Sequence, residues 1–73
     1  MDMPHFLMEC AELLEQEPGT VAPENDLLSL GWDSAAVVGF LAMCDSQYGK
    51  APSPEKIRKC VTIQDLYELV ANE

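Results

Sequence analysis

The run of residues 34–48 most constrains how this chain can fold, because apolar residues occupy most of its length at helical spacing. Asp33 and Ser34, just before it, are both good N-terminal helix caps, and Gly49, just after it, is a typical C-terminal stop. The apolar stripe is broad and comprises Val37, Leu41, Cys44 and Tyr48, widened by Val38, Phe40 and Met43. Such breadth predicts a central helix over residues 34–48 that contacts several neighbours.

Three further segments carry helical patterns. These segments are residues 3–16, 54–59 and 62–72. The last has the clearest start signal, since Thr62 can cap while Asp65 follows three residues later in a variant of the capping box. No segment shows a strand pattern or a repeat. The sequence therefore predicts one all-α domain over residues 1–73, a small four-helix bundle with three longer helices and one short helix.

The connection between the first two predicted helices, residues 17–33, is long. Loops of that length inside a compact domain are uncommon and often functional. The connection contains four apolar residues, Val21, Leu27, Leu28 and Leu30. They predict that the connection packs over the helices and does not stand free.

Charge is distributed unevenly along the chain. The net charge is −9, yet all four basic residues fall between residues 50 and 59. An acidic field repels nucleic acids and anionic membranes, so neither is an expected partner. It attracts basic protein surfaces and speeds their encounter, although it also serves solubility alone.

The remaining bulk features point to a soluble protein. No apolar run reaches the roughly 20 residues that a membrane-spanning helix needs. The N-terminal segment lacks the basic flank of a signal peptide, so we expect the protein to lie in the cytoplasm. We also expect it to be a monomer. The three cysteines are odd in number and widely spaced, which fits neither a disulfide framework nor paired zinc ligands, so we expect small core residues at Cys10, Cys44 and Cys60.

Ser34 is the candidate functional residue, because a serine at a loop–helix junction is exposed and lies at the positive end of the helix dipole. A catalytic role would need a base. The only histidine, His5, starts a different predicted helix, and the flanks of Ser34 do not form a G-x-S-x-G elbow. A calcium loop beginning at Asp45 fails, because Lys50 and Lys56 stand where its glycine and its bidentate glutamate belong. We expect no catalytic residue and no metal site.

These residues together resemble the acyl carrier proteins. The resemblance rests on the sequence LSLGWDSA at residues 28–35, the apolar helix and Tyr48-Gly49 after it, and VTIQDL at residues 61–66. In that family the serine of an Asp-Ser-Leu motif bears a 4′-phosphopantetheine arm, taken from coenzyme A, whose thiol carries acyl groups as thioesters. The resemblance implies that Ser34 is the attachment residue, that Asp33 belongs to its motif, and that the chain is a carrier rather than an enzyme.

The resemblance also implies partner enzymes. They would be a phosphopantetheinyl transferase and acyl-loading or acyl-processing enzymes, namely a synthetase, a ketosynthase and an acyltransferase. The candidate contact residues for these partners are Trp32, Ala35 and Val38. For Trp32 we favour packing beneath the loop over partner contact, because the family usually has a bulky apolar residue there.

Two departures from the family pattern bear on the pathway. Ala35 replaces the usual leucine after the serine, and Asp45 is the only acid in residues 34–48, where fatty-acid carriers usually display several. We therefore expect a specialised fatty-acid, polyketide or related pathway with its own partner set. A peptidyl or aminoacyl carrier remains the alternative, although such carriers usually have paired glycines where this chain has Gly31-Trp32. An unmodified helical interaction module, with Asp33 and Ser34 as mere caps, is a third possibility.

Overall fold

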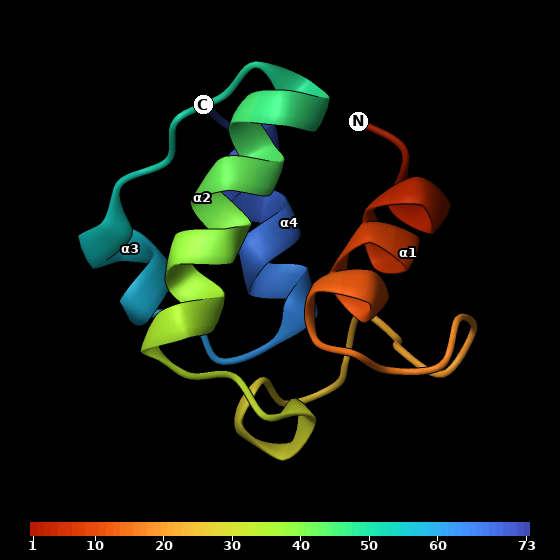
Figure 1. The fold of residues 1–73 in the computed structure, drawn as a ribbon. Helices are drawn as coiled ribbons and strands as arrows, with labels where there is room; N and C mark the ends of the chain where they lie inside the picture. The colour runs from red at the N-terminus through yellow and green to blue at the C-terminus, as the bar shows by residue number, and fades with distance from the viewer.

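The computed structural model describes residues 1–73 and is all-helical, as the sequence predicts. Its elements in chain order are α1 (Met3–Leu13), the 3-10 turn η1 (Leu28–Leu30), α2 (Ser34–Tyr48), α3 (Pro54–Arg58) and α4 (Ile63–Ala71) (Figure 1). Helices α2 and α4 begin at the same end of the bundle, α1 runs in the opposite direction, and both chain termini lie at the far end. The four-helix bundle with one short helix is confirmed.

The observed helix bounds differ from the predicted ones mainly in α1. The apolar pattern continues to Leu14, yet α1 ends at Leu13 because the chain turns there. Glu15 has a φ of 56°, in the left-handed region that interrupts a helix, and the Gln16 N–H donates to the Ala11 carbonyl at 2.8 Å. The bounds of α2 match the prediction, and α3 ends one residue earlier than predicted. Helix α4 is one residue shorter at each end, and Thr62 caps it from outside.

The core lies between α1, α2 and α4 and is closed from the side by α3. Phe6 and Phe40 are fully buried at its centre, with their rings edge to face and 6.0 Å apart. Cys10 and Cys44 are buried, as expected, whereas Cys60 is only half-buried. The other buried members of the core are Ala11, Val21, Leu27, Val37, Ile57, Ile63, Leu66 and Val70.

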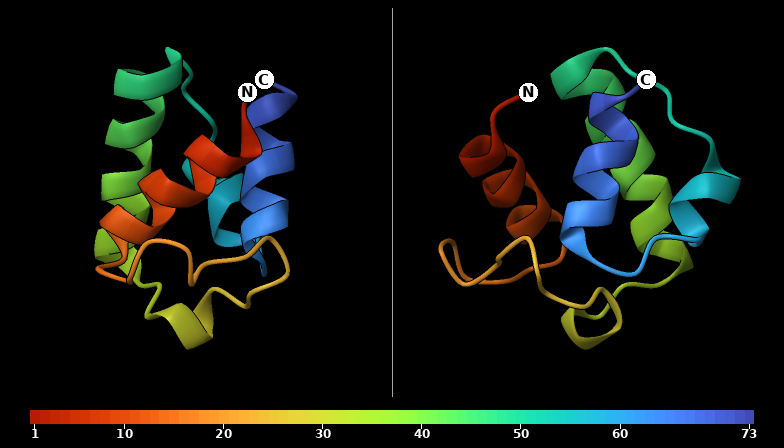
Figure 2. Two further views of the ribbon diagram at one scale, coloured as in Figure 1. Left: turned by 90° about the vertical axis from the view of Figure 1, so that its right-hand side faces the viewer. Right: turned by 180° about the vertical axis from the view of Figure 1, so that it is seen from behind.

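The long connection before α2 passes beside the α3–α4 connection and the start of α4 (Figure 2), and backbone hydrogen bonds tie it to both. The Leu27 N–H donates to the Val61 carbonyl at 2.8 Å, and the Gln64 N–H donates to the Pro23 carbonyl at 2.8 Å. An isolated antiparallel bridge joins Asp26 and Thr62 beside these bonds. The connection is therefore anchored across the end of the bundle where α2 and α4 begin, and it fixes the entry into α2.

One predicted anchor of this connection is wrong. Val21 and Leu27 are buried and Leu30 is half-buried, but Leu28 leaves 79% of its surface exposed. The reason is that Leu28 begins η1, a single tight turn, which turns Leu27 inward and Leu28 outward. Apolar composition alone did not distinguish the two leucines.

The start of α4 is a capping box, as the sequence predicts. The Thr62 hydroxyl accepts from the Asp65 N–H at 3.2 Å, while the Asp65 carboxylate accepts from the N–H groups of Val61 at 2.9 Å and Thr62 at 3.1 Å. The hydrogen bonds from these two backbone groups hold the pKa of Asp65 below its usual 3.8. The ionised carboxylate is thus the form that stabilises the fold.

Replacing Asp65 by alanine is expected to lower the free energy of unfolding by about 1 kcal/mol at neutral pH, because its carboxylate accepts backbone hydrogen bonds and a hydrogen bond contributes about 0.5–1.5 kcal/mol net. Because the folded pKa lies below the unfolded one, this contribution is complete above the unfolded value of 3.8 and is lost as the pH falls through the folded pKa. Urea unfolding of both proteins at neutral pH and at about pH 2 measures it. Equal stabilities at neutral pH would contradict the assignment.

Candidate functional site

The entry into α2 is set by three consecutive residues with different backbone conformations. Gly31 ends η1 with a φ of 85°, a left-handed conformation that glycine adopts without strain. Trp32 follows, and Asp33 is extended with a φ of −145°. The Asp33 carboxylate accepts a hydrogen bond from the Ala36 N–H at 2.9 Å and so caps the helix. Asp33 is therefore the cap, and Ser34 is the first residue of α2.

Ser34 is exposed at the start of a 15-residue helix. At this position its hydroxyl lies beside backbone N–H groups that lack intrahelical partners and beside the positive end of the helix dipole. A negatively charged group attached to the hydroxyl would be stabilised there, typically by about 0.3–1 kcal/mol.

A hollow of about 200 Å³ adjoins Ser34, and its lining consists of Trp32, Asp33, Ser34, Val37 and Arg58. Trp32 is half-buried and packs edge to face on Phe40 with ring centroids 5.7 Å apart, in agreement with the packing interpretation. Arg58 comes from α3, which packs against α2. Sequence reasoning noted a basic cluster in this helix but did not identify which of its residues adjoins Ser34.

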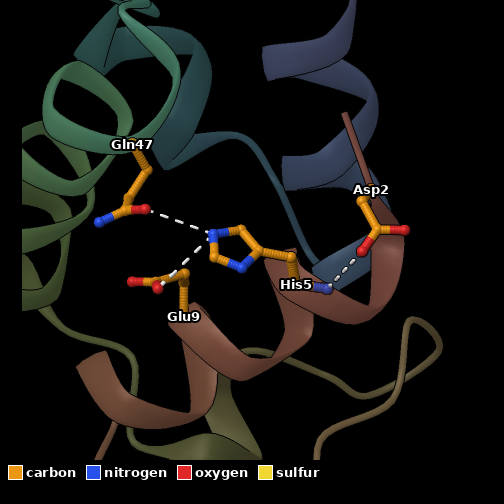
Figure 3. A network of polar contacts seen from close by, with 4 residues as sticks. All are labelled: Asp2, His5, Glu9 and Gln47. Carbon is orange, nitrogen blue, oxygen red and sulfur yellow. Dashed lines mark hydrogen bonds and ion pairs between the residues drawn. The ribbon is translucent and has the colours of Figure 1, made fainter.

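The only histidine, His5 on α1, lies beside Gln47 near the C-terminal end of α2 (Figure 3), whereas Ser34 is the first residue of that helix. His5 Nε2 is 3.3 Å from the Gln47 side-chain oxygen and 3.7 Å from the Glu9 carboxylate. Gln47 and Ser34 are thirteen residues apart on one helix, which separates them by about 20 Å at 1.5 Å per residue. Ser34 therefore has no imidazole within reach to act as a general base.

None of the three cysteine thiols is poised to act as a nucleophile. Burial, followed by the proximity of Cys44 and Glu9, raises the pKa of Cys10 to about 12. Burial raises the pKa of Cys44 to about 11, and burial followed by the nearby Asp65 carboxylate raises that of Cys60. All three stay protonated at neutral pH, and the thiolate is the reactive form.

The surface next to Ser34 is apolar. Ala35 is exposed, and Val38, one turn further along α2, is 68% exposed. Leu28 on η1 adds a large exposed side chain just before this helix, which sequence reasoning had assigned to packing. The only acid on α2, Asp45, lies eleven residues beyond Ser34, or about 16 Å along the helix axis.

No three His, Cys, Asp or Glu side chains lie close enough together to hold a metal ion. No helix combines the length and the apolar content that crossing a bilayer requires.

Comparison of the sequence with models of protein families identifies the family of this chain. The sequence model of the family described as "Phosphopantetheine attachment site" matches residues 6–70, from the start of the core in α1 to the last buried residue of α4. No curated protein matches the chain. The family is defined by covalent attachment of 4′-phosphopantetheine, and its members are carrier domains that do not catalyse reactions themselves. The chain belongs to the family of phosphopantetheine-bearing carrier domains.

Proposed function

We propose that Ser34 is the attachment residue and that the chain is an acyl carrier protein, with residues 1–73 forming one carrier domain. The observation that carries the proposal is the position of Ser34 as the first, exposed residue of α2, beside a hollow that also holds a basic side chain. The arm supplies a thiol on a flexible tether, on which an acyl group is carried as a thioester. Coenzyme A is the donor of the arm, and a phosphopantetheinyl transferase attaches it.

The residues around Ser34 suit the attachment of an anionic arm. Asp33 caps the helix, so the hydroxyl of Ser34 is not needed as a cap and is left for modification. The helix N-terminus favours the negative charge of the phosphodiester. The high pKa values of the buried thiols of Cys10 and Cys44 leave the thiol of the arm as the main nucleophile of the carrier at neutral pH.

Two features support an acyl cargo and a specialised pathway. Gly31 is followed by Trp32, which packs on Phe40, instead of by the second glycine usual in peptidyl carriers. Beyond its cap Asp33, α2 carries a single acid, Asp45, so the helix offers little attraction to the basic docking patches of bulk fatty-acid enzymes. We therefore propose a fatty-acid, polyketide or related pathway with a dedicated synthetase, ketosynthase or acyltransferase.

Loading reactions on the modified protein test this proposal. The holo protein is offered a fatty acid with ATP and an acyl-loading synthetase, and separately amino acids with a broad-specificity adenylating enzyme. Intact mass before and after hydroxylamine, which cleaves thioesters, reads out the cargo. An acyl thioester is the expected product, whereas an aminoacyl thioester alone would identify a peptidyl carrier. Efficient loading by a standard fatty-acid malonyl transferase would contradict the specialised pathway.

We further propose that the apolar face formed by Leu28, Ala35 and Val38 contacts the partner enzymes, together with the exposed edge of Trp32. Its support is that Leu28 and Val38 are two of the most exposed large apolar side chains and come from η1, just before Ser34, and from the second turn of α2, just after it. Exposed apolar side chains of this kind mark interaction sites when they cluster.

Replacing Val38 by serine is expected to lower kcat/KM for acyl loading about tenfold, because truncating a residue at the energetic centre of an interface costs more than about 1 kcal/mol. The stability should change by less than about 0.5 kcal/mol, since the side chain is exposed. Met8→Ser is the matched control, because Met8 is 60% exposed but lies on α1 outside this face. Equal loading of the two variants would contradict the assignment of the face.

A further inference from the structure

We propose that Arg58 binds the phosphodiester group of the arm and thereby sets the direction in which the arm leaves the protein. This inference rests on the proposed attachment at Ser34 and adds a specific anion-binding residue from a different helix.

The first observation is the composition of the hollow beside Ser34. Its five lining residues include one cation, Arg58, in a protein whose net charge is −9. Lys50, Lys56 and Lys59 do not line it. Arg58 is therefore the only cationic residue that lines the hollow beside Ser34.

The second observation is how α3 holds Arg58. The preceding residue, Ile57, is fully buried in the core, and α3 packs against both α2 and α4. This anchoring directs the next side chain to the surface on the Ser34 side. Lys59 pairs with Glu55 across one turn at 3.9 Å, whereas no carboxylate lies within 4.0 Å of Arg58 as an ion-pair partner. Arg58 is thus free to bind an anion.

The third observation is that the negative charge of Asp33 lies next to the proposed attachment point. The Asp33 carboxylate lines the same hollow and is held in place by its hydrogen bond to the Ala36 N–H. A phosphodiester on Ser34 would therefore begin next to an existing negative charge. Arginine presents paired N–H donors that match two phosphate oxygens, and such charge-assisted bonds are about twice as strong as neutral ones. Arg58 fits this task better than a lysine.

Binding of the phosphodiester by Arg58 would fix the direction in which the arm leaves Ser34. The phosphodiester would lie between the first turn of α2 and the end of α3, beside Trp32 and Val37. The flexible remainder of the arm would then project from the α3 side of α2. Arg58 acts here as a positioning residue, because it touches the tether and takes no part in thioester chemistry.

The test uses the fact that Arg58 is the only arginine of the chain. Its side-chain Nε–H group gives a single arginine cross-peak in the NMR spectrum, so the signal is assigned to Arg58 without further experiments. We expect this cross-peak to shift and its exchange with water to slow when apo protein is converted to holo protein. In the Arg58→Gln variant, the phosphorus resonance of the holo protein should move toward that of a free phosphodiester. In Arg58→Lys it should move part of that distance, and in Lys59→Gln it should stay at the wild-type position.

Thermal unfolding supplies a readout that is independent of NMR. The change in Tm on attaching the arm should be less favourable by several degrees in Arg58→Gln than in wild type, because Asp33 then faces the phosphodiester without compensation. Lys59→Gln should behave as wild type. An arm located on Ser34 with an unchanged Arg58 cross-peak, or equal changes in Tm for Arg58→Gln and Lys59→Gln, would overturn this inference alone. Failure to modify Ser34 would overturn the proposed function and this inference with it.

Discussion

Replacing Ser34 by alanine is expected to abolish the uptake of phosphopantetheine from coenzyme A completely. The arm is attached through the hydroxyl oxygen, and alanine offers no oxygen to form the phosphodiester. The variant should fold normally, because Asp33 provides the helix cap and alanine is well tolerated in the first turn. Intact mass after incubation with coenzyme A and a broad-specificity transferase measures the uptake, and circular dichroism confirms the fold.

Ser46→Ala is the matched control for this experiment. Ser46 lies on the same helix and is also exposed, but it is near the C-terminal end of α2, where the helix dipole is negative. This variant should take up one arm, as wild type does. Uptake by Ser34→Ala would show that another residue accepts the arm and would contradict the account.

Replacing Phe40 by alanine is expected to remove a large part of the stability of the fold. Phe40 is fully buried, and its ring contacts Phe6 at 6.0 Å and Trp32 at 5.7 Å between centroids. Truncating a buried phenylalanine costs about 3–5 kcal/mol, and a domain of this size has only about 4–11 kcal/mol in total. Urea unfolding followed by circular dichroism measures the loss.

Phe40 also connects the core to the attachment site, since it supports Trp32 just before Ser34. Phe40→Ala should therefore be modified more slowly than wild type even at a temperature where it is folded. Val38→Ala, two residues earlier on the same helix but exposed, should change stability by less than about 0.5 kcal/mol. A loss below about 1 kcal/mol for Phe40→Ala would contradict the assignment of the core.

The sequence predicts the helix that carries the site correctly, because local signals mark both of its ends. Asp33 supplies the cap, and Gly49 ends α2 in a left-handed conformation with a φ of 62°. The capping box of Thr62 and Asp65 marks α4 in the same way. For the first helix the stop signal is Pro18-Gly19, so the prediction ran to residue 16, whereas α1 ends at Leu13.

Features that depend on contacts between distant segments could not be predicted in this way. Leu28 differs from Leu27 only in the direction that η1 gives it, and that turn is held by bonds to the α3–α4 connection. Arg58 is one of three basic residues in or next to α3, and only the packing of α3 on α2 places it beside Ser34. Local sequence therefore predicted the position of Ser34 at the start of α2, while the surroundings of Ser34 required the tertiary structure.

The most direct test of the account is to find where the arm is attached. The wild-type protein is incubated with coenzyme A and the transferase, digested, and its peptides are fragmented in a mass spectrometer. The account predicts that one phosphopantetheine group is added and that the fragment ions locate it on Ser34. An arm on Ser29, Ser46, Ser53 or any other residue, or no arm under conditions that modify a control carrier, would contradict it.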